Sequence, residues 1–196
     1  MTAVSAWRRG RLTPTSTLFS GGSGNALFQG GDLASLANGY AVAASNGAGA
    51  AAPIVNDTYD QSGEAYGDQL CRLAVKLTLS SVTLGQGALL YLWLATLGLD
   101  GTTYGDGNFP IGASYGTQQA FYPGWNPVGV LPVTYTGAAV TVVAGCIDFW
   151  LPPGIHLPIL GNALVNSSGS GVTLSSTAAN NLVEFASYNN QNDAAS

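Results

Sequence analysis

The strict alternation in CRLAVKLTL, residues 71–79, constrains the fold of this chain more than any other feature. Side chains of a β-strand point alternately to the two faces of a sheet, so a period of two is typical of a half-buried strand. We therefore predict a strand here that turns one row of apolar side chains toward a core. That row consists of Leu73, Val75, Leu77 and Leu79.

Strand and turn patterns continue from about Ile54 to the end of the chain. ALLYLWLATL is apolar on both faces, which predicts a central strand covered on both sides. PVGVLPVTYT and AVTVVAGCIDFWL predict two strands joined at Gly137, and Pro158 within IHLPILGNALV predicts an edge strand or a bulge. GVTLSST and NLVEFASYN predict a closing hairpin. Because no segment after residue 54 has a capped helical pattern, we predict an all-β, antiparallel β-sandwich of jelly-roll type over residues 53–196.

Residues 1–52 have a different texture, with Gly and Ala dominant in SGGSGN and AVAASNGAGAAAP. Few long side chains are available to build an independent core, so the segment is either a disordered leader or an extended arm that orders on a neighbouring subunit. We favour the arm and expect the sandwich to fold without it. Three arginines would pair with acidic groups of the partner and apolar side chains would fill its pockets. These residues are Arg8, Arg9, Arg11, Leu18, Phe19, Leu27 and Phe28.

Only 8% of the residues are charged, against roughly 25% in an average globular domain. A free monomer normally carries a mixed, charged surface, so this composition favours burial against neighbours and predicts a homo-oligomer. The net charge of −5 argues against nucleic acid as the main ligand, because phosphate contacts need clustered Lys and Arg. The longest apolar run, Ala88 to Leu99, is shorter than the roughly twenty residues that cross a bilayer.

No constellation for catalysis, a cofactor or a metal assembles in the sequence. His156 is the one histidine, it has no nucleophile motif beside it, and we expect it at a surface or an interface. The acidic residues of VNDTYDQSGEAYGDQ and the Asp-Gly pairs of DGTTYGDGN suit solvated connectors and turns better than calcium loops. Cys71 and Cys146 both lie in apolar strands, so we expect two buried, reduced thiols.

Three aromatic residues lie close together in AFYPGWNP, a predicted loop. They are Phe121, Tyr122 and Trp125. Exposed aromatic rings on a sandwich loop stack on sugars or pack on a partner subunit, and the alternative is a loop folded onto its own sandwich. The sequence leaves both interpretations open.

From Ile54 onward the chain resembles small virion proteins of tailed bacteriophages. The resemblance is carried by NDTYDQSGEAYGDQL, by LLYLWLATLGLDGTTYGDG, and by the terminal stretch DFWLPPGIHLPILGNALVNSSGSGVTLSSTAANNLVEFASYNNQ. It implies a non-catalytic β-sandwich displayed on a capsid or tail, with the major capsid protein or other virion proteins as partners. A trimer is implied as well, because threefold positions are common attachment points on capsid lattices.

Two functions follow as hypotheses. The first is a capsid decoration or cement protein, located in the virion, that locks neighbouring capsomers through its arm and loops. The second is a tail fibre, spike or baseplate-type module whose loops bind a glycan of the host surface. An enzyme finds no support in the residues.

Overall fold

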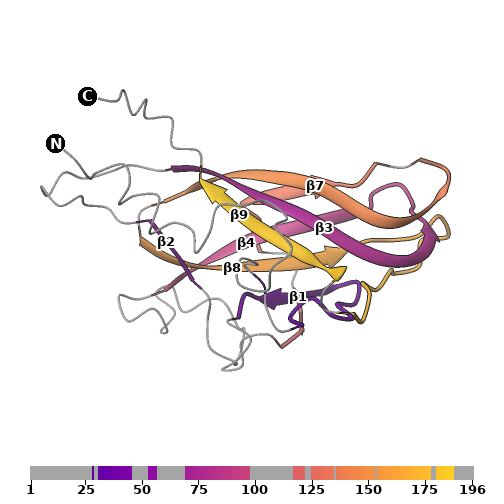
Figure 1. Cartoon of the computed structure of the whole chain (residues 1–196), viewed down its shortest axis with the longest axis horizontal. Helices are drawn as coiled ribbons and strands as arrows, with labels where there is room; N and C mark the ends of the chain where they lie inside the picture. Colours follow the sequence, from indigo (N-terminus) through magenta and orange to yellow (C-terminus); the bar gives the residue numbers. More distant parts are fainter. Residues whose placement is uncertain are drawn as a thin grey trace, which may run out of the picture.

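The computed structural model describes nine stretches of the chain, and the structural statements below concern these residues. They are 28, 31–45, 53–56, 69–97, 117–121, 125–134, 136–152, 154–177 and 180–187. Strands account for the regular structure, and they form two antiparallel sheets that pack against each other as a β-sandwich (Figure 1). The predicted fold class is therefore confirmed, while its jelly-roll connectivity stays a prediction.

The larger sheet has the strand order β5-β1-β8-β4-β6, and β2 pairs with β8 beside this path. Its central strands are β8 and β4, as expected for the apolar run ALLYLWLATL. The strands of this sheet are β1 (Tyr40–Ala43), β2 (Ile54–Asn56), β4 (Leu89–Leu97), β5 (Gln119–Ala120), β6 (Gly129–Pro132) and β8 (Gly154–Ala163).

The smaller sheet has the order β7-β3-β9, with β3 (Gln69–Thr83) between β7 (Ala139–Leu151) and β9 (Leu182–Ser187). In Figure 1 strand β7 runs along the top of the molecule, and β3 and β9 descend diagonally from there. The alternation that predicted β3 is confirmed, because all four apolar residues of the predicted row are buried in the core shared by the two sheets. They are Leu73, Val75, Leu77 and Leu79.

Two glycines let the sheets approach closely where β6 lies against β7. A Cβ atom on Gly145 of β7 would come within 2.8 Å of the Leu131 side chain, and one on Gly129 of β6 would collide with Ile147. Since real Cβ atoms do not come so close to their neighbours, a larger residue at either position would force the Leu131 or Ile147 side chain to shift. This contact places β6 and β7, the terminal strands of their sheets, on the same side of the sandwich.

Pro158 corrects the prediction of an edge strand, because β8 pairs with β4 on one side and with β1 and β2 on the other. The carbonyl oxygen of Pro158 accepts a hydrogen bond from the Ala44 N–H at 2.9 Å, just past the end of β1. The missing N–H of proline therefore falls at the junction between β1 and β2, where no ladder bond is lost.

The predicted closing hairpin is also wrong. Strand β9 pairs with β3, and Leu174 of the GVTLSST segment forms an isolated antiparallel bridge to Leu79, further along the same strand. The two segments thus lie end to end along one edge of β3. Asn181 fixes the excursion between them, because its side chain accepts from the Thr78 N–H at 2.9 Å and donates to the Ser175 carbonyl at 2.9 Å.

The described part of residues 1–52 departs from the expected arm, because it is integrated into the sandwich. Strand β1 pairs with both β5 and β8, and Phe28, Leu33 and Leu36 are buried in the same core as the strands that follow. The alanines that made the segment look unable to fold are buried as well, at Ala41, Ala43 and Ala44. Small side chains pack here because a neighbouring sheet supplies the rest of the core.

Buried polar side chains anchor this segment. Asn162, with none of its surface exposed, donates to the carbonyls of Leu36 and Val172 at 2.8 Å each and accepts from the Leu164 N–H at 2.9 Å. At the far end of the segment, the Asp32 carboxylate accepts from the N–H and the hydroxyl of Ser45, at 2.8 and 2.6 Å. These bonds hold residues 32–45 as a fixed part of the fold.

Candidate functional site

The loop aromatics that the sequence singled out pack on their own sandwich. Phe121 and Trp125 are partly buried, and their rings lie 5.3 and 5.7 Å from Trp93 of β4, measured between ring centroids. Tyr91 completes the cluster at 5.5 Å from Trp93 and 5.7 Å from Phe121. Tyr122 lies outside the described residues. Of the two interpretations left open, the folded-back loop accounts for both described rings, which stay partly exposed to a ligand.

The cluster depends on a glycine in the neighbouring strand. A Cβ atom on Gly161 of β8 would collide with the Trp93 ring and would lie 3.4 Å from Phe121. Trp93 itself is 2% exposed, and its indole N–H points to the Trp125 carbonyl at 3.4 Å. The sequence showed the loop aromatics but not Trp93 as their centre, because pairing β4 with β8 is what brings Gly161 beneath the indole.

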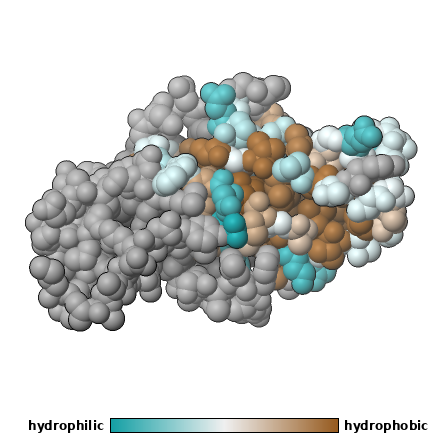
Figure 2. Space-filling view, turned by 90° about the horizontal axis from the view of Figure 1, so that it is seen from above, coloured by the Kyte–Doolittle hydropathy of each residue, from teal (hydrophilic) through white to brown (hydrophobic). Residues whose placement is uncertain are grey.

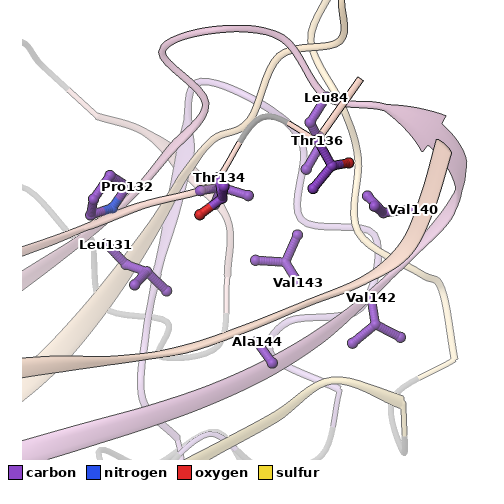
Figure 3. A pocket seen from close by; sticks show the side chains of 10 residues that line it. Leu84, Leu131, Pro132, Thr134, Thr136, Val140, Val142, Val143 and Ala144 are labelled. Carbon is purple, nitrogen blue, oxygen red and sulfur yellow. The ribbon is translucent and has the colours of Figure 1, made fainter. Parts of the chain in front are cut away.

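An apolar groove of about 180 Å³ lies between β6, the segment that follows it, and the start of β7 (Figure 3). None of its lining residues is charged, and only two threonine hydroxyls are polar side-chain groups there. The chemistry suits an apolar side chain or a strand backbone better than an ion. The lining residues are Leu84, Leu131, Pro132, Val133, Thr134, Thr136, Val140, Val142, Val143 and Ala144.

A second, more open hollow of about 360 Å³ lies between two turns, where Gly85 and Gln86 face residues 165–169. The Asn166 side-chain oxygen accepts from the N–H groups of Ser168 and Ser170, both at 2.9 Å. These two hydrogen bonds occupy the side-chain oxygen of Asn166 and hold the turn in shape. The residues that line the hollow therefore offer backbone groups and the polar side chains of Gln86, Asn166 and Ser167, and no charge, to a ligand.

His156 corrects the expectation of a surface histidine, since it is 2% exposed within β8. Its Nε2 atom lies 3.0 Å from the Pro152 carbonyl oxygen. No group of three or more His, Cys, Asp or Glu side chains that could hold a metal occurs among the described residues. The acidic residues of the two connectors considered for calcium, from Asp57 to Asp68 and from Asp100 to Asn108, lie outside those residues.

The two cysteines lie in different environments, so the expectation of two buried thiols holds for one of them. Cys71 is fully buried, and burial raises the pKa of its thiol to about 12. Cys146 is exposed on the outer face of β7, opposite Ala74 of β3. A disulfide between them is excluded, because their side chains point to opposite faces of the sheet.

One ion pair lies on the outer face of the smaller sheet. The Arg72 guanidinium donates two hydrogen bonds to the Asp148 carboxylate, at 2.6 and 2.8 Å, across directly paired positions of β3 and β7. These hydrogen bonds hold the pKa of Asp148 below its usual range. Both side chains stay more than a third exposed, at 35% and 46%, so solvent screening keeps the contribution to stability small.

Of the residues predicted to contact a partner through the arm, one lies among the described residues. Phe28 lies in the core of its own chain, at 4% exposure, which removes it from a partner-binding role. The other six residues proposed for the arm, from Arg8 to Leu27, lie outside the described residues.

Comparisons of the chain with protein-family models, with curated proteins and with solved structures found no match. Within the described residues, no helix is long and apolar enough to cross a membrane.

Proposed function

We propose that this chain is a non-catalytic structural protein of a tailed-bacteriophage virion, a capsid decoration or cement protein that binds the major capsid protein or other virion proteins. The observation that carries the proposal is a sandwich whose sides expose large apolar side chains in a nearly uncharged setting. Figure 2 shows apolar residues gathered on the face seen from above, with a few hydrophilic residues among them. The exposed large apolar residues among those described are Tyr40, Val128, Val130, Val142 and Trp150.

Exposed apolar groups of this kind favour a protein that works within an assembly. A contiguous apolar area on a soluble domain is a binding surface or an aggregation liability, and a repeating lattice covers it with neighbours. The groove between β6 and β7 adds a concave, uncharged site for a neighbouring chain. A cement protein needs such surfaces and needs no catalytic group.

The experiment is to label intact particles with antibodies against this chain and to image them by electron microscopy. We expect label distributed over the whole capsid shell. The capsids of particles assembled without the chain should come apart at a lower temperature than those of complete particles, because a cement protein stabilises contacts between capsomers. Label confined to the tail would contradict the cement role, and absence of label from purified particles would contradict the virion role.

The alternative is a tail fibre, spike or baseplate-type module that binds a glycan of the host surface. It is favoured by the partly exposed rings of Tyr91, Phe121 and Trp125, since sugar rings stack on aromatic faces. Binding of the purified chain to host surface polysaccharide, abolished by Trp125→Ala and not by Trp150→Ala, would support this alternative. The cement role predicts no such binding.

A further inference from the structure

Strand β7 is a long terminal strand that pairs regularly with β3 from Val142 to Leu151, and a register shift of β3 between Thr78 and Val82 lies opposite the start of the strand. It borders only β3 within its sheet, and the described residues supply no backbone hydrogen bond to its other edge. From Ala139 to Ile147 the strand contains no charged residue and no proline. Natural proteins protect edges with lysines, prolines, bulges or covering loops, because an open ladder pairs with another strand. The edge of β7 is thus chemically suited to accept a strand.

The exposed side chains of β7 are arranged symmetrically about one position. Trp150 is 61% exposed and Val142 is 42% exposed, and they are the two large apolar residues that β7 exposes. Each lies four residues from Cys146, so all three share the outer face of the strand. The other residues of that row are Ala144 and Asp148, also exposed and each two residues from Cys146.

We propose that β7 pairs antiparallel with β7 of a second copy of this chain, about a two-fold axis that passes through Cys146. In this register Trp150 of each copy lies opposite Val142 of the other, so both exposed apolar side chains are covered. The two smaller sheets then form one continuous six-stranded sheet, β9-β3-β7 followed by the same strands of the second copy in reverse order. The occupant is a second copy because the strand complements itself: one rotation pairs both of its large exposed groups.

The charges agree with the same register. Asp148 lies opposite Ala144 of the second copy, so no carboxylate faces another, and Arg72 of its own chain already binds it. A strand pair with like charges directly opposed would be destabilised. The segment 142–150 is about 30 Å long at about 3.3 Å per residue. The area that one strand edge of this length buries is smaller than that of a standard interface, which is roughly 800 Å² per partner. We therefore expect reversible association that is populated at tens of micromolar or above.

The first test traps the contact through Cys146. Residues directly opposite in antiparallel strands have Cα atoms about 4.5–5.5 Å apart, within the range of about 4.4–6.8 Å that a disulfide spans. Diamide would oxidise the two facing thiols to a disulfide, while its N=N bond takes up the two electrons and two protons. The chain has one other cysteine, Cys71, which is fully buried. We expect a covalent dimer in the native full-length chain and in Cys71→Ala, and none in Cys146→Ser.

The second test separates edge pairing from random collision. Val142 on β7 and Val130 on β6 are matched in residue type and in exposure, at 42% and 41%. Val142→Glu places a carboxylate against the Trp150 ring of the other copy, whereas Val130 lies outside the proposed contact. By sedimentation equilibrium, we expect Val142→Glu to weaken dimerisation about tenfold or more, because each substitution acts twice in a two-fold interface. Val130→Glu should change it less than about twofold.

The outcomes decide the proposal independently of any virion role. A dimer that is weakened by Val142→Glu and cross-linked at Cys146 supports it. A strictly monomeric profile at about 100 µM, a trimer, or a dimer equally affected by both glutamate variants overturns it. Cross-linking that survives Val142→Glu at full yield also overturns it, since the disulfide would then report collision alone.

Discussion

Replacing Asn162 with leucine tests whether the N-terminal segment is a structural part of the sandwich. Leucine has a similar size, so the substitution removes hydrogen bonds without opening a large cavity. It leaves the carbonyls of Leu36 and Val172 and the N–H of Leu164 without the partner that Asn162 supplies in the buried interior. The Leu36 carbonyl keeps a hydrogen bond from the Leu174 N–H at 3.1 Å, so the Val172 carbonyl and the Leu164 N–H bear the main loss. Each buried group left unpaired costs about 1–3 kcal/mol. Because neighbouring losses do not add fully, we expect the free energy of unfolding to fall by about 2–5 kcal/mol.

The assay is urea denaturation followed by tryptophan fluorescence, together with a thermal melt. A loss of about 4 kcal/mol corresponds to a fall of roughly 8–16 °C in Tm for a domain of this size. Asn38→Leu is the matched control, since Asn38 is only half-buried and makes a single bond, from its Nδ2 to the Leu164 carbonyl at 2.9 Å. It should cost about 1 kcal/mol. Equal effects of the two variants, or a loss below about 1 kcal/mol for Asn162→Leu, would refute the reasoning.

Three further outcomes follow from the described contacts. Deleting residues 1–50 should abolish cooperative unfolding in circular dichroism, because it removes β1 and four further buried core side chains, and a sharp transition like that of the full chain would contradict this. At neutral pH a thiol reagent should label Cys146 at once and Cys71 only after unfolding, as counted by mass spectrometry, since burial raises the Cys71 pKa to about 12. Arg72→Ala should lower the free energy of unfolding by less than about 1 kcal/mol above pH 5 and not at all once Asp148 is protonated. The pKa of Asp148 is lowered because its carboxylate binds Arg72, and this interaction stabilises the fold only while the carboxylate is charged. Denaturation at pH 7 and at pH 2 checks this.

The sequence predicted strands where burial follows a local period. The row from Leu73 to Leu79 alternates because β3 has one core face, and ALLYLWLATL lacks alternation because both faces of β4 are covered. Such patterns depend only on neighbours along the chain. The position of Pro158 depends instead on where β1 ends and β2 begins beside β8, which a local pattern does not contain.

The N-terminal segment escaped prediction for a related reason. Ala41, Ala43 and Ala44 carry little apolar area of their own, and their burial depends on β8, more than a hundred residues away in the chain. The amide of Asn162 is likewise separated by 126 residues from Leu36. Only the pairing of distant strands shows that a Gly/Ala-rich stretch completes a sheet.

The positions of the described charged residues show how the low charge of the chain affects the surface around β7. Asp32 is buried and binds Ser45, while Arg72 and Asp148 neutralise each other on the smaller sheet. Lys76 of β3 is exposed on the same outer face, directly opposite Ala144 of β7, so one positive charge borders the exposed row from Val142 to Trp150. In the proposed register Asp148 of the second copy lies opposite Ala144, on the side of this lysine, so the two copies meet there without like-charge repulsion. The composition predicted that the chain associates, and the alternation of β7 identifies the surface on which association costs least.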